Sequence, residues 1–308
     1  MKIISGQTKL HLQDESAVVI GKFDGMHRGH QFLILELMRC AALPPHTLRT
    51  VVFTFDPSPA VFFSGQEQRE LFTKEEKRRV FAKLGIDLLI EYPLNADTAK
   101  IPAEAFVRDI LNRALHARLI VAGSDLTFGY KGLGDVALLE SLKRELHYET
   151  SIVEKLMHEG REISSTYVRE TVSAGRMEEA ALLLGAPYIV SGRVQHGKRL
   201  GHTIGFPTVN LLPPEEKLLP PDGVYFTKTL IDGMLCDGMT NIGVRPTVSS
   251  DGSRSVETHL FDCDKDLYGA EIEVSMMHFH RKETAFADIA ALKAQLKKDR
   301  TAAEAFFA

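Results

Sequence analysis

The chain has 308 residues, about twice the length of a typical single domain, so two domains are expected and one large domain is the alternative. Hydrophobic residues make up 44% and charged residues 25%, a balance typical of globular proteins that excludes a fibrous or disordered chain. The net charge of -4 gives no general attraction for a polyanion, so we expect no nucleic-acid partner. The apolar runs are far shorter than the roughly 18 residues of a membrane span, so we expect no membrane partner either.

The cysteines bear on the cellular location. Cys40, Cys236 and Cys263 are far apart in the sequence and form no C-x-x-C pair. This pattern predicts neither a disulfide framework nor a zinc knuckle, and it favours a reducing cytoplasm. The first ten residues lack the basic stretch and apolar segment of a secretory signal, so we expect none. Nothing in the sequence pattern fixes an oligomeric state.

Residues 1–184 alternate β-rich runs with amphipathic stretches of helical length. This alternation predicts a parallel sheet with crossover helices on both faces, which is a doubly wound, Rossmann-like α/β domain. Ligands of such sheets bind at the carboxyl ends of the strands, so chemistry is expected in the loops after Ile20, Phe55 and Ala122. The predicted strands are Val18–Ile20, Thr50–Phe55, Ile86–Tyr92, Leu119–Ala122 and Ser151–Leu156. The predicted helices are Gly29–Ala42, Thr73–Leu84, Pro102–Leu115 and Asp135–Leu146.

The composition changes after residue 184. Residues 185–252 hold 10 of the 23 glycines and 7 of the 13 prolines, a density that prevents long helices and predicts turns between short strands. Residues 185–308 are therefore expected to form a compact β domain, with a hairpin turn at Asp232-Gly233. A helix closes this domain, with one apolar face made by Phe286, Ile289, Leu292 and Leu296. The predicted strands are Tyr188–Val194, Gly223–Leu230, Met234–Ile242, Val256–Leu260 and Glu271–Phe279.

The segment from Gly21 to His30 reads G-K-F-D-G-M-H-R-G-H and lies between a predicted strand and a predicted helix. Gly25 and Gly29 let the backbone pass close to a bound group, and His27 and His30 come near each other at the positive end of the helix. Fixed N–H donors there suit phosphate oxygens, including those of a nucleotide attacked at its α-phosphate. Two helix-capping histidines are the plain alternative. A zinc pair is a third interpretation, but no further ligand is near in the sequence.

Three companion motifs follow along the chain. F-D-P-S-P begins at Phe55, G-S-D-L-T-F-G begins at Gly123, and I-S-S-T-Y-V-R ends at Arg169. In the last of these, hydroxyls and N–H groups at a helix start, together with one arginine, form a second anion clamp. A capping box with an exposed arginine is the alternative interpretation.

These motifs resemble the H-x-G-H nucleotidyltransferases, and G-x-F-D-G-x-H-x-G-H is similar to their bacterial FAD synthetase branch. Asp56, Ser58 and Leu126 depart from the residues that are usual in that family. The resemblance implies that the phosphate of FMN attacks the α-phosphate of ATP, giving FAD and pyrophosphate. It implies catalytic roles for His27 and His30. The residues that it implies for binding flavin are Pro57 and Phe128, and those for binding ATP or its phosphates are Gly21, Phe23, Asp24, Gly25, Gly29, Asp125, Ser164, Ser165, Thr166 and Arg169.

A second set of motifs begins with G-H-T-I-G-F-P-T-V-N, which ends at Asn210. The Thr208 hydroxyl and the Asn210 carbonyl, two residues apart on an extended segment, point the same way and are hard oxygen ligands that suit Mg²⁺ with a nucleotide. A turn beside a strand explains this run equally well. N-I-G-V-R-P-T from Asn241, V-E-T-H-L from Val256 and D-L-Y-G from Asp266 follow in order.

Together these blocks resemble the riboflavin kinase module, so nearly the whole chain is similar to the bacterial bifunctional riboflavin kinase/FAD synthetase (FMN adenylyltransferase) family. The resemblance implies a small antiparallel β-barrel that transfers the γ-phosphate of ATP to riboflavin, with Mg²⁺ in both reactions. It implies that Glu257 is the base that accepts the proton of the ribityl hydroxyl, which turns a poor nucleophile into a competent one. The other implied residues are Thr208 and Asn210 for the metal, Gly201, Gly205 and Pro207 for ATP, and Arg245 and Arg281 for flavin.

Two departures keep other interpretations open. Val209 stands where the family usually has alanine, and His202 replaces a frequent arginine, so that a titratable charge replaces a permanent one. One rival is therefore an adenylyltransferase whose barrel only binds flavin. Another is a flavin-sensing protein with two decayed sites, although the candidate catalytic and metal residues are all present. For Glu257, a plain surface position on an edge strand is the alternative.

Overall fold

The computed structural model describes residues 1–44, 47–64, 69–195, 201, 204–231, 233–244, 254–263 and 265–308. Contacts within the chain form two compact units. Unit 1 comprises Met1–Gln68 and Lys74–Ser165, and unit 2 comprises Arg69–Thr73 and Thr166–Ala308. The domain boundary predicted between residues 184 and 185 follows the change in composition. That residues 1–184 and residues 185–308 are separate domains stays a prediction.

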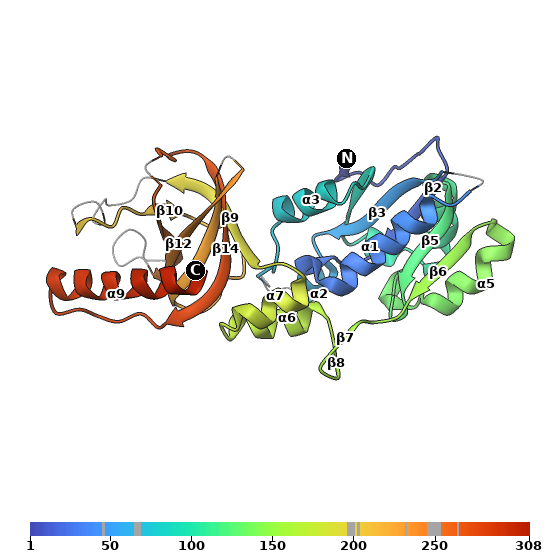
Figure 1. Cartoon of the computed structure of the whole chain (residues 1–308). Coiled ribbons are helices and arrows are strands. Elements are labelled where there is room, and N and C mark those ends of the chain that lie inside the picture. Colours follow the sequence, from blue (N-terminus) through green and yellow to red (C-terminus); the bar gives the residue numbers. More distant parts are fainter. Residues whose placement is uncertain are drawn as a thin grey trace. The chain divides into compact units, whose positions relative to one another are not determined.

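Unit 1 is built on a six-stranded sheet in the order β1-β4-β3-β2-β5-β6. Figure 1 shows its strands β3, β2, β5 and β6. All five pairings between neighbouring strands are parallel, so the predicted doubly wound α/β fold is confirmed. The edge strand β1 escaped prediction because four residues carry too little periodicity. The strands are β1 (Lys2–Ser5), β2 (Ser16–Ile20), β3 (Arg49–Asp56), β4 (Leu88–Pro93), β5 (Ala117–Gly123) and β6 (Glu149–Val153).

Helices cover both faces of this sheet, because alternate residues of a strand point to opposite sides. On one face, Val18, Phe53 and Ile120 join a core cluster with residues of η3 and α5. Helix α1 contacts β2, β5 and β3, and its buried Ile34 and Leu37 lie outside that cluster. The helices are η1 (Asp24–Met26), α1 (Arg28–Ala41), α2 (Pro59–Ser64), α3 (Lys74–Lys83), η2 (Thr98–Lys100), α4 (Ala103–Ala105), η3 (Phe106–Ala114), η4 (Tyr130–Gly132) and α5 (Val136–Leu146), and the strands β7 (Met157–His158) and β8 (Arg161–Glu162) form a small hairpin.

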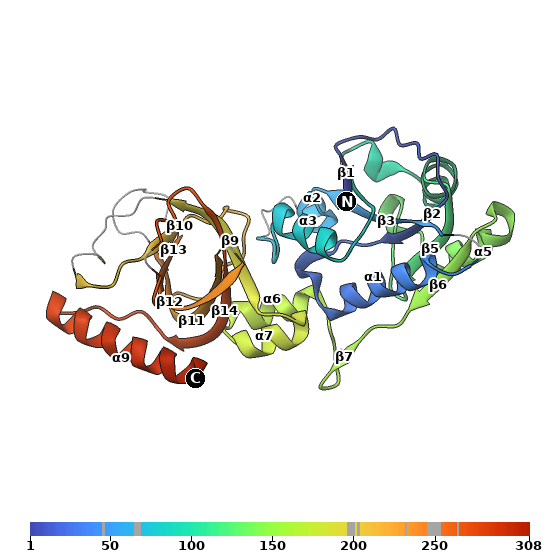
Figure 2. The same cartoon turned by 45° about the horizontal axis from the view of Figure 1, so that its top comes forward.

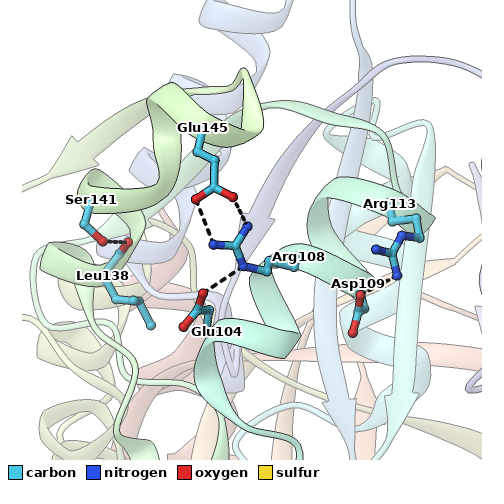
Figure 3. A network of polar contacts seen from close by, with 7 residues as sticks. All are labelled: Glu104, Arg108, Asp109, Arg113, Leu138, Ser141 and Glu145. Carbon is cyan, nitrogen blue, oxygen red and sulfur yellow. Dashed lines mark hydrogen bonds and ion pairs between the residues drawn. The ribbon is translucent and has the colours of Figure 1, made fainter.

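Element η3 is a π-helix, and the N–H of Leu115 donates to the carbonyl of Ile110 at 3.0 Å at its end. Arg108 on η3 forms two hydrogen bonds with Glu145 of α5, at 2.5 and 2.8 Å, and one with Glu104 at 2.8 Å (Figure 3). An exposed pair of this kind contributes little to stability, because solvent screens it. It joins η3 to α5 through side chains on their surfaces.

Unit 2 contains a closed antiparallel barrel in the order β10-β13-β12-β11-β14-β9 (Figure 2). The predicted β domain is therefore confirmed as a barrel, and the hairpin between β11 and β12 pairs Ile231 with Met234. Asp232, the first predicted turn residue, lies outside the described residues. The elements are α6 (Ser165–Ser173), α7 (Met177–Leu184), β9 (Tyr188–Gln195), β10 (Val209–Leu211), β11 (Gly223–Ile231), β12 (Met234–Val244), β13 (Arg254–Leu260), β14 (Glu271–Arg281) and α9 (Ile289–Phe307).

Three threonine hydroxyls form a hydrogen-bonded chain in the barrel interior. Thr240 Oγ1 lies 2.9 Å from that of Thr227 and 2.8 Å from that of Thr258, and all three side chains are fully buried. The buried hydroxyl of Thr258 therefore has a partner, which is what burial of a polar group requires.

We expect Thr240→Val to destabilise unit 2 by about 1–3 kcal/mol, because it leaves the hydroxyls of Thr227 and Thr258 buried without their shared partner. Urea unfolding monitored by circular dichroism measures the loss. The matched control replaces all three threonines with valine, which removes the unpaired groups together and recovers most of the stability. Equal losses in the single and triple variants would contradict this account.

The closing helix α9 is held to the barrel by a buried carboxylate. Asp299 is fully buried, accepts from the Arg281 guanidinium at 2.6 Å, and accepts from Gln295 at 2.8 Å. The predicted apolar face is right for Leu292 and Leu296, which pack against the barrel. It is wrong for the other two positions, because the helix begins after its N-cap Asp288, so that Phe286 precedes it and Ile289 is exposed.

Residues 69–73 pack with unit 2 although they lie within the first quarter of the chain. The N–H of Glu70 donates to the carbonyl of Glu216, and the N–H of Leu218 donates to the carbonyl of Glu70. Lys217, between Glu216 and Leu218 in the sequence, is buried. Its ammonium donates to the carbonyl of Leu71 at 2.7 Å and lies 4.4 Å from the centre of the Tyr188 ring. A buried ammonium is thus offset by a carbonyl and an aromatic face.

Candidate functional site

The first candidate site lies where the strand order of the unit 1 sheet changes direction. Strand β2 pairs with β3 on one side and with β5 on the other, so the loops that follow β2 and β5 flank the switch point. Open α/β sheets bind ligands at this place. The predicted loops after Ile20 and Ala122 are the two that meet there.

The loop after β2 adopts left-handed backbone at Phe23 (φ 50°), Gly25 (φ 77°) and Met26 (φ 44°). The Phe23 ring is fully buried and packs 5.2 Å from the His30 ring. A Cβ at Gly21 would lie 2.9 Å from the Phe23 ring, so this position requires glycine. The structure therefore gives Phe23 a packing contact with His30, which the sequence reasoning missed, and its predicted contact with ATP stays a prediction.

The two histidine rings stack with their centroids 3.7 Å apart. His27 is the N-cap of α1, and its Nδ1 accepts from the N–H of His30 at 3.4 Å. The capping alternative thus describes one nitrogen of His27. Because Nδ1 is the acceptor, the proton of the neutral ring is on Nε2, where it is free to be donated to a phosphate oxygen.

Both imidazoles are neutral at pH 7. Burial lowers the pKa of His27 to about 4, and the carboxylate of Asp125 opposes this shift. Burial and the neighbouring His27 ring lower the pKa of His30 well below 6.5. The pair therefore offers N–H dipoles to a phosphate, and a full positive charge is not part of its ground state.

We expect unit 1 to lose stability as the pH falls from 6.5 towards 4. In this range His27 is protonated in the unfolded chain but stays neutral in the folded one, so protons favour unfolding. The shift of the His27 pKa accounts for roughly 3 kcal/mol of this loss. Urea unfolding at pH 7 and pH 4.5 measures it for the wild-type chain and for His27→Asn, which keeps an acceptor for the cap. A pH dependence as steep in the variant as in the wild type would contradict the assignment.

A hydrogen bond joins the predicted anion clamp to the loop after β2. The Ser165 hydroxyl donates to the carbonyl of Asp24 at 2.8 Å, which brings these two predicted phosphate residues together. Thr166 and Arg169 belong to unit 2, and the guanidinium of Arg169 donates to the carbonyl of Arg69. Phosphate contacts of Ser164, Thr166 and Arg169 stay a prediction.

The loop after β5 brings a charge pair to the same edge. Asp125 forms an ion pair with Lys155 at 3.0 Å, and Lys155 also pairs with Glu162 at 2.7 Å. A lone carboxylate would repel phosphate oxygens, but Asp125 is paired with Lys155, and its contact with ATP stays a prediction. Lys155 is a cation that sequence reasoning missed, because a single lysine after a strand forms no motif.

Phe128 and Pro57, the two flavin-binding residues predicted in unit 1, lie in different surroundings. Phe128 is buried, 5.6 Å from the Phe106 ring, and belongs to the core cluster of the sheet. Pro57 follows a cis peptide bond at the end of β3, and the neighbouring Asp56 forms an ion pair with Lys74. Flavin contacts of Pro57 and Phe128 stay predictions.

The second candidate site is a row of polar side chains on the outer face of the barrel. Glu257 on β13 is in register with Asn210 on β10 and with Asn241 on β12, and residues in register point to the same side of a sheet. Val256 and Thr258, on either side of Glu257, are fully buried, whereas Glu257 is half-buried. Strand pairing thus places the predicted base beside the predicted metal ligand.

A backbone hydrogen bond joins Gly201 and Phe206 in the segment before β10. The N–H of Phe206 donates to the carbonyl of Gly201 at 2.8 Å, and a Cβ at Gly201 would lie 2.2 Å from the Phe206 carbonyl oxygen. Gly205 has φ +82° and lies shortly before Pro207 and Thr208. ATP and metal contacts of these residues stay predictions.

Arg245 and Arg281 are the two flavin-binding residues predicted for the second site. Arg245 lies outside the described residues, as does His202. Arg281 forms its hydrogen bonds with Asp299 of α9, and its flavin contact stays a prediction. Within the described ranges, no group of three or more His, Cys, Asp or Glu could hold a metal ion.

Among the residues that the structure describes, no helix combines the length and the apolar character that crossing a membrane requires.

Comparison with known proteins identifies two family models in the chain. The FAD synthetase model matches residues 9–167, and the riboflavin kinase model matches residues 184–307. A crystal structure described as a macrolide-efflux protein from Streptococcus pneumoniae superposes with a TM-score of 0.87 and 32% identity, covering 98% of each chain.

Two curated relatives match nearly end to end. The bifunctional riboflavin kinase/FMN adenylyltransferase of Listeria monocytogenes is 37% identical over 293 residues, covering 94% of this chain and 92% of that protein. The protein of the same name from Escherichia coli K12 is 35% identical over 312 residues, covering 100% of this chain and 98% of that protein. By these matches and by its two units, the chain belongs to the bifunctional riboflavin kinase/FMN adenylyltransferase family.

Proposed function

We propose that the chain converts riboflavin to FMN at the barrel of unit 2 and FMN to FAD at the sheet edge of unit 1. Riboflavin, FMN and ATP are its small-molecule partners, and its location is the cytoplasm, where its three free thiols stay reduced. The observation that carries this proposal is the register of Glu257 with Asn210 and Asn241. It is supported by the stacked pair of His27 and His30 in the loop after β2 of the other unit.

In the first reaction, the ribityl hydroxyl of riboflavin attacks the γ-phosphate of ATP. Glu257 accepts the hydroxyl proton. The bond between the γ-phosphorus and the oxygen that bridges it to the β-phosphorus breaks, and ADP leaves. The Thr208 hydroxyl and the Asn210 carbonyl are hard oxygen ligands that fit Mg²⁺, which usually keeps several waters and binds phosphates as well. When bound there, Mg²⁺ neutralises phosphate charge.

In the second reaction, a phosphate oxygen of FMN attacks the α-phosphate of ATP and pyrophosphate leaves. Charge grows on the nonbridging and leaving oxygens, and N–H donors held by the fold stabilise it without having to reorganise. The Nε2–H of His27 is one such donor, because capping of α1 occupies only Nδ1. No covalent enzyme intermediate is needed, since positioning and charge neutralisation suffice.

Chromatography of the flavins tests the proposal. The chain is incubated with riboflavin and ATP in magnesium buffer, and separately with FMN and ATP. We expect FAD in both reactions, with FMN as an intermediate in the first. Riboflavin left unchanged while FMN becomes FAD would support the single-activity rival, and no reaction in either mixture would support the flavin-sensing rival.

A further inference from the structure

His259 lies two residues after Glu257 on β13, and the alternation of a strand places both side chains on the outer face of the barrel. The His259 side chain is buried, and its ring meets Phe206 at 5.2 Å and Phe261 at 5.7 Å in edge-on contacts. Such a position is ordinary for a packed aromatic ring. What distinguishes it is the polar contact that the ring makes.

His259 Nδ1 lies 2.7 Å from the carbonyl oxygen of Pro207. A carbonyl oxygen only accepts, so Nδ1 carries the hydrogen and donates it. Burial lowers the pKa of His259, an effect that Arg300 strengthens and that Asp262 and the bond to Pro207 oppose. The ring is therefore neutral at pH 7, and Nε2 is a bare acceptor, buried without a partner among the described residues.

The hydrogen bond fixes the chain at the residue before the predicted metal ligand Thr208. Pairing of β10 with β13 begins one residue after Thr208, where Val209 is opposite Thr258. Thr208 is thus held between two points, the carbonyl of Pro207 on its N-terminal side and the first ladder pair on its C-terminal side. The partners at the two points, His259 and Thr258, both belong to β13, the strand that also carries Glu257.

We propose that His259 is a positioning residue for riboflavin phosphorylation, which sets the Thr208 hydroxyl relative to Glu257 by holding the Pro207 carbonyl. The inference rests on the proposed function of the barrel. Loss of the bond frees the Pro207–Thr208 segment, so that ATP with its metal binds to a less organised site. The donor has to lie at the Nδ1 position for this purpose.

Two variants of similar polarity separate this role from packing. In His259→Asn the amide N–H lies where Nδ1 lies now, and in His259→Gln it is displaced towards the position of Nε2. Steady-state kinetics gives KM for ATP at fixed free Mg²⁺, the Mg²⁺ concentration for half-maximal rate, and kcat for FMN formation. Phe261→Leu is the matched control, because it loosens the packing of the ring and leaves its donor in place.

We expect His259→Gln to raise KM for ATP about tenfold and to raise the half-maximal Mg²⁺ concentration, since a buried hydrogen bond is lost. His259→Asn is expected to stay within about threefold of the wild type, as is Phe261→Leu. Equal effects of the Asn and Gln variants, or no effect of either, would overturn the inference. A wild-type chain that forms FAD from FMN but no FMN from riboflavin would instead overturn the proposed function of the barrel.

Discussion

Glu257→Gln is expected to lower FMN formation from riboflavin by at least about 100-fold, because an amide cannot take the proton of the ribityl hydroxyl and general bases contribute on this order. The substitution keeps the shape of the side chain and its place in register with Asn210. FAD formation from supplied FMN is expected to be unchanged. Both rates are measured by flavin chromatography on one preparation.

The control for Glu257→Gln is Glu271→Gln, the same chemical change at an exposed carboxylate at the start of β14. It is expected to leave both activities at the wild-type level. If Glu257→Gln also abolished FAD formation from FMN in a folded chain, the assignment of two separate sites would be wrong. If it left FMN formation intact, Glu257 would be a surface residue of its strand.

His30→Ala is expected to have the opposite effect. It removes an imidazole stacked on His27, and the loss of one fixed donor to developing phosphate charge costs on the order of 100-fold or more. FAD formation from FMN therefore falls by that factor, while FMN formation from riboflavin persists. Assaying the two half-reactions separately, with ATP saturating, measures both.

The packing of His30 requires a second variant. Its ring packs against that of Phe23, so alanine leaves unfilled space as well as removing a donor. His30→Phe fills most of that space without any N–H, and it is expected to be as inactive as His30→Ala in FAD formation. His11→Ala, at an exposed histidine of the same unit, is the control. Wild-type activity in His30→Phe would remove His30 from the chemistry.

The parts of the sites that lie within a single motif were predictable from sequence. The spacing of His27 and His30 after a β-branched run and before an amphipathic stretch predicts a loop at the carboxyl end of a strand. The structure has this loop between β2 and α1. Strand alternation also predicted that the loop after β5 would contribute, and β5 is the neighbour of β2.

What escaped prediction depends on pairing across the chain. The position of Asn210 beside Glu257 follows from the register of β10 with β13, and β10 has only three residues, too few for a pattern. The place of Phe23 under His30 needs left-handed backbone at a residue that is not glycine, which sequence statistics disfavour. The contact of His259 with Pro207 spans 52 positions and has no local signature.

Because Arg69–Thr73 belong to unit 2, truncation of the chain affects this unit. The barrel unit is discontinuous in sequence, so a truncated protein that starts at the change in composition would lack the carbonyl of Leu71. The ammonium of Lys217 would then lose a hydrogen bond at 2.7 Å that offsets its burial. Separating the two catalytic halves by genetic dissection therefore removes more than a linker, and point substitutions in the intact polypeptide are the cleaner way to silence one half.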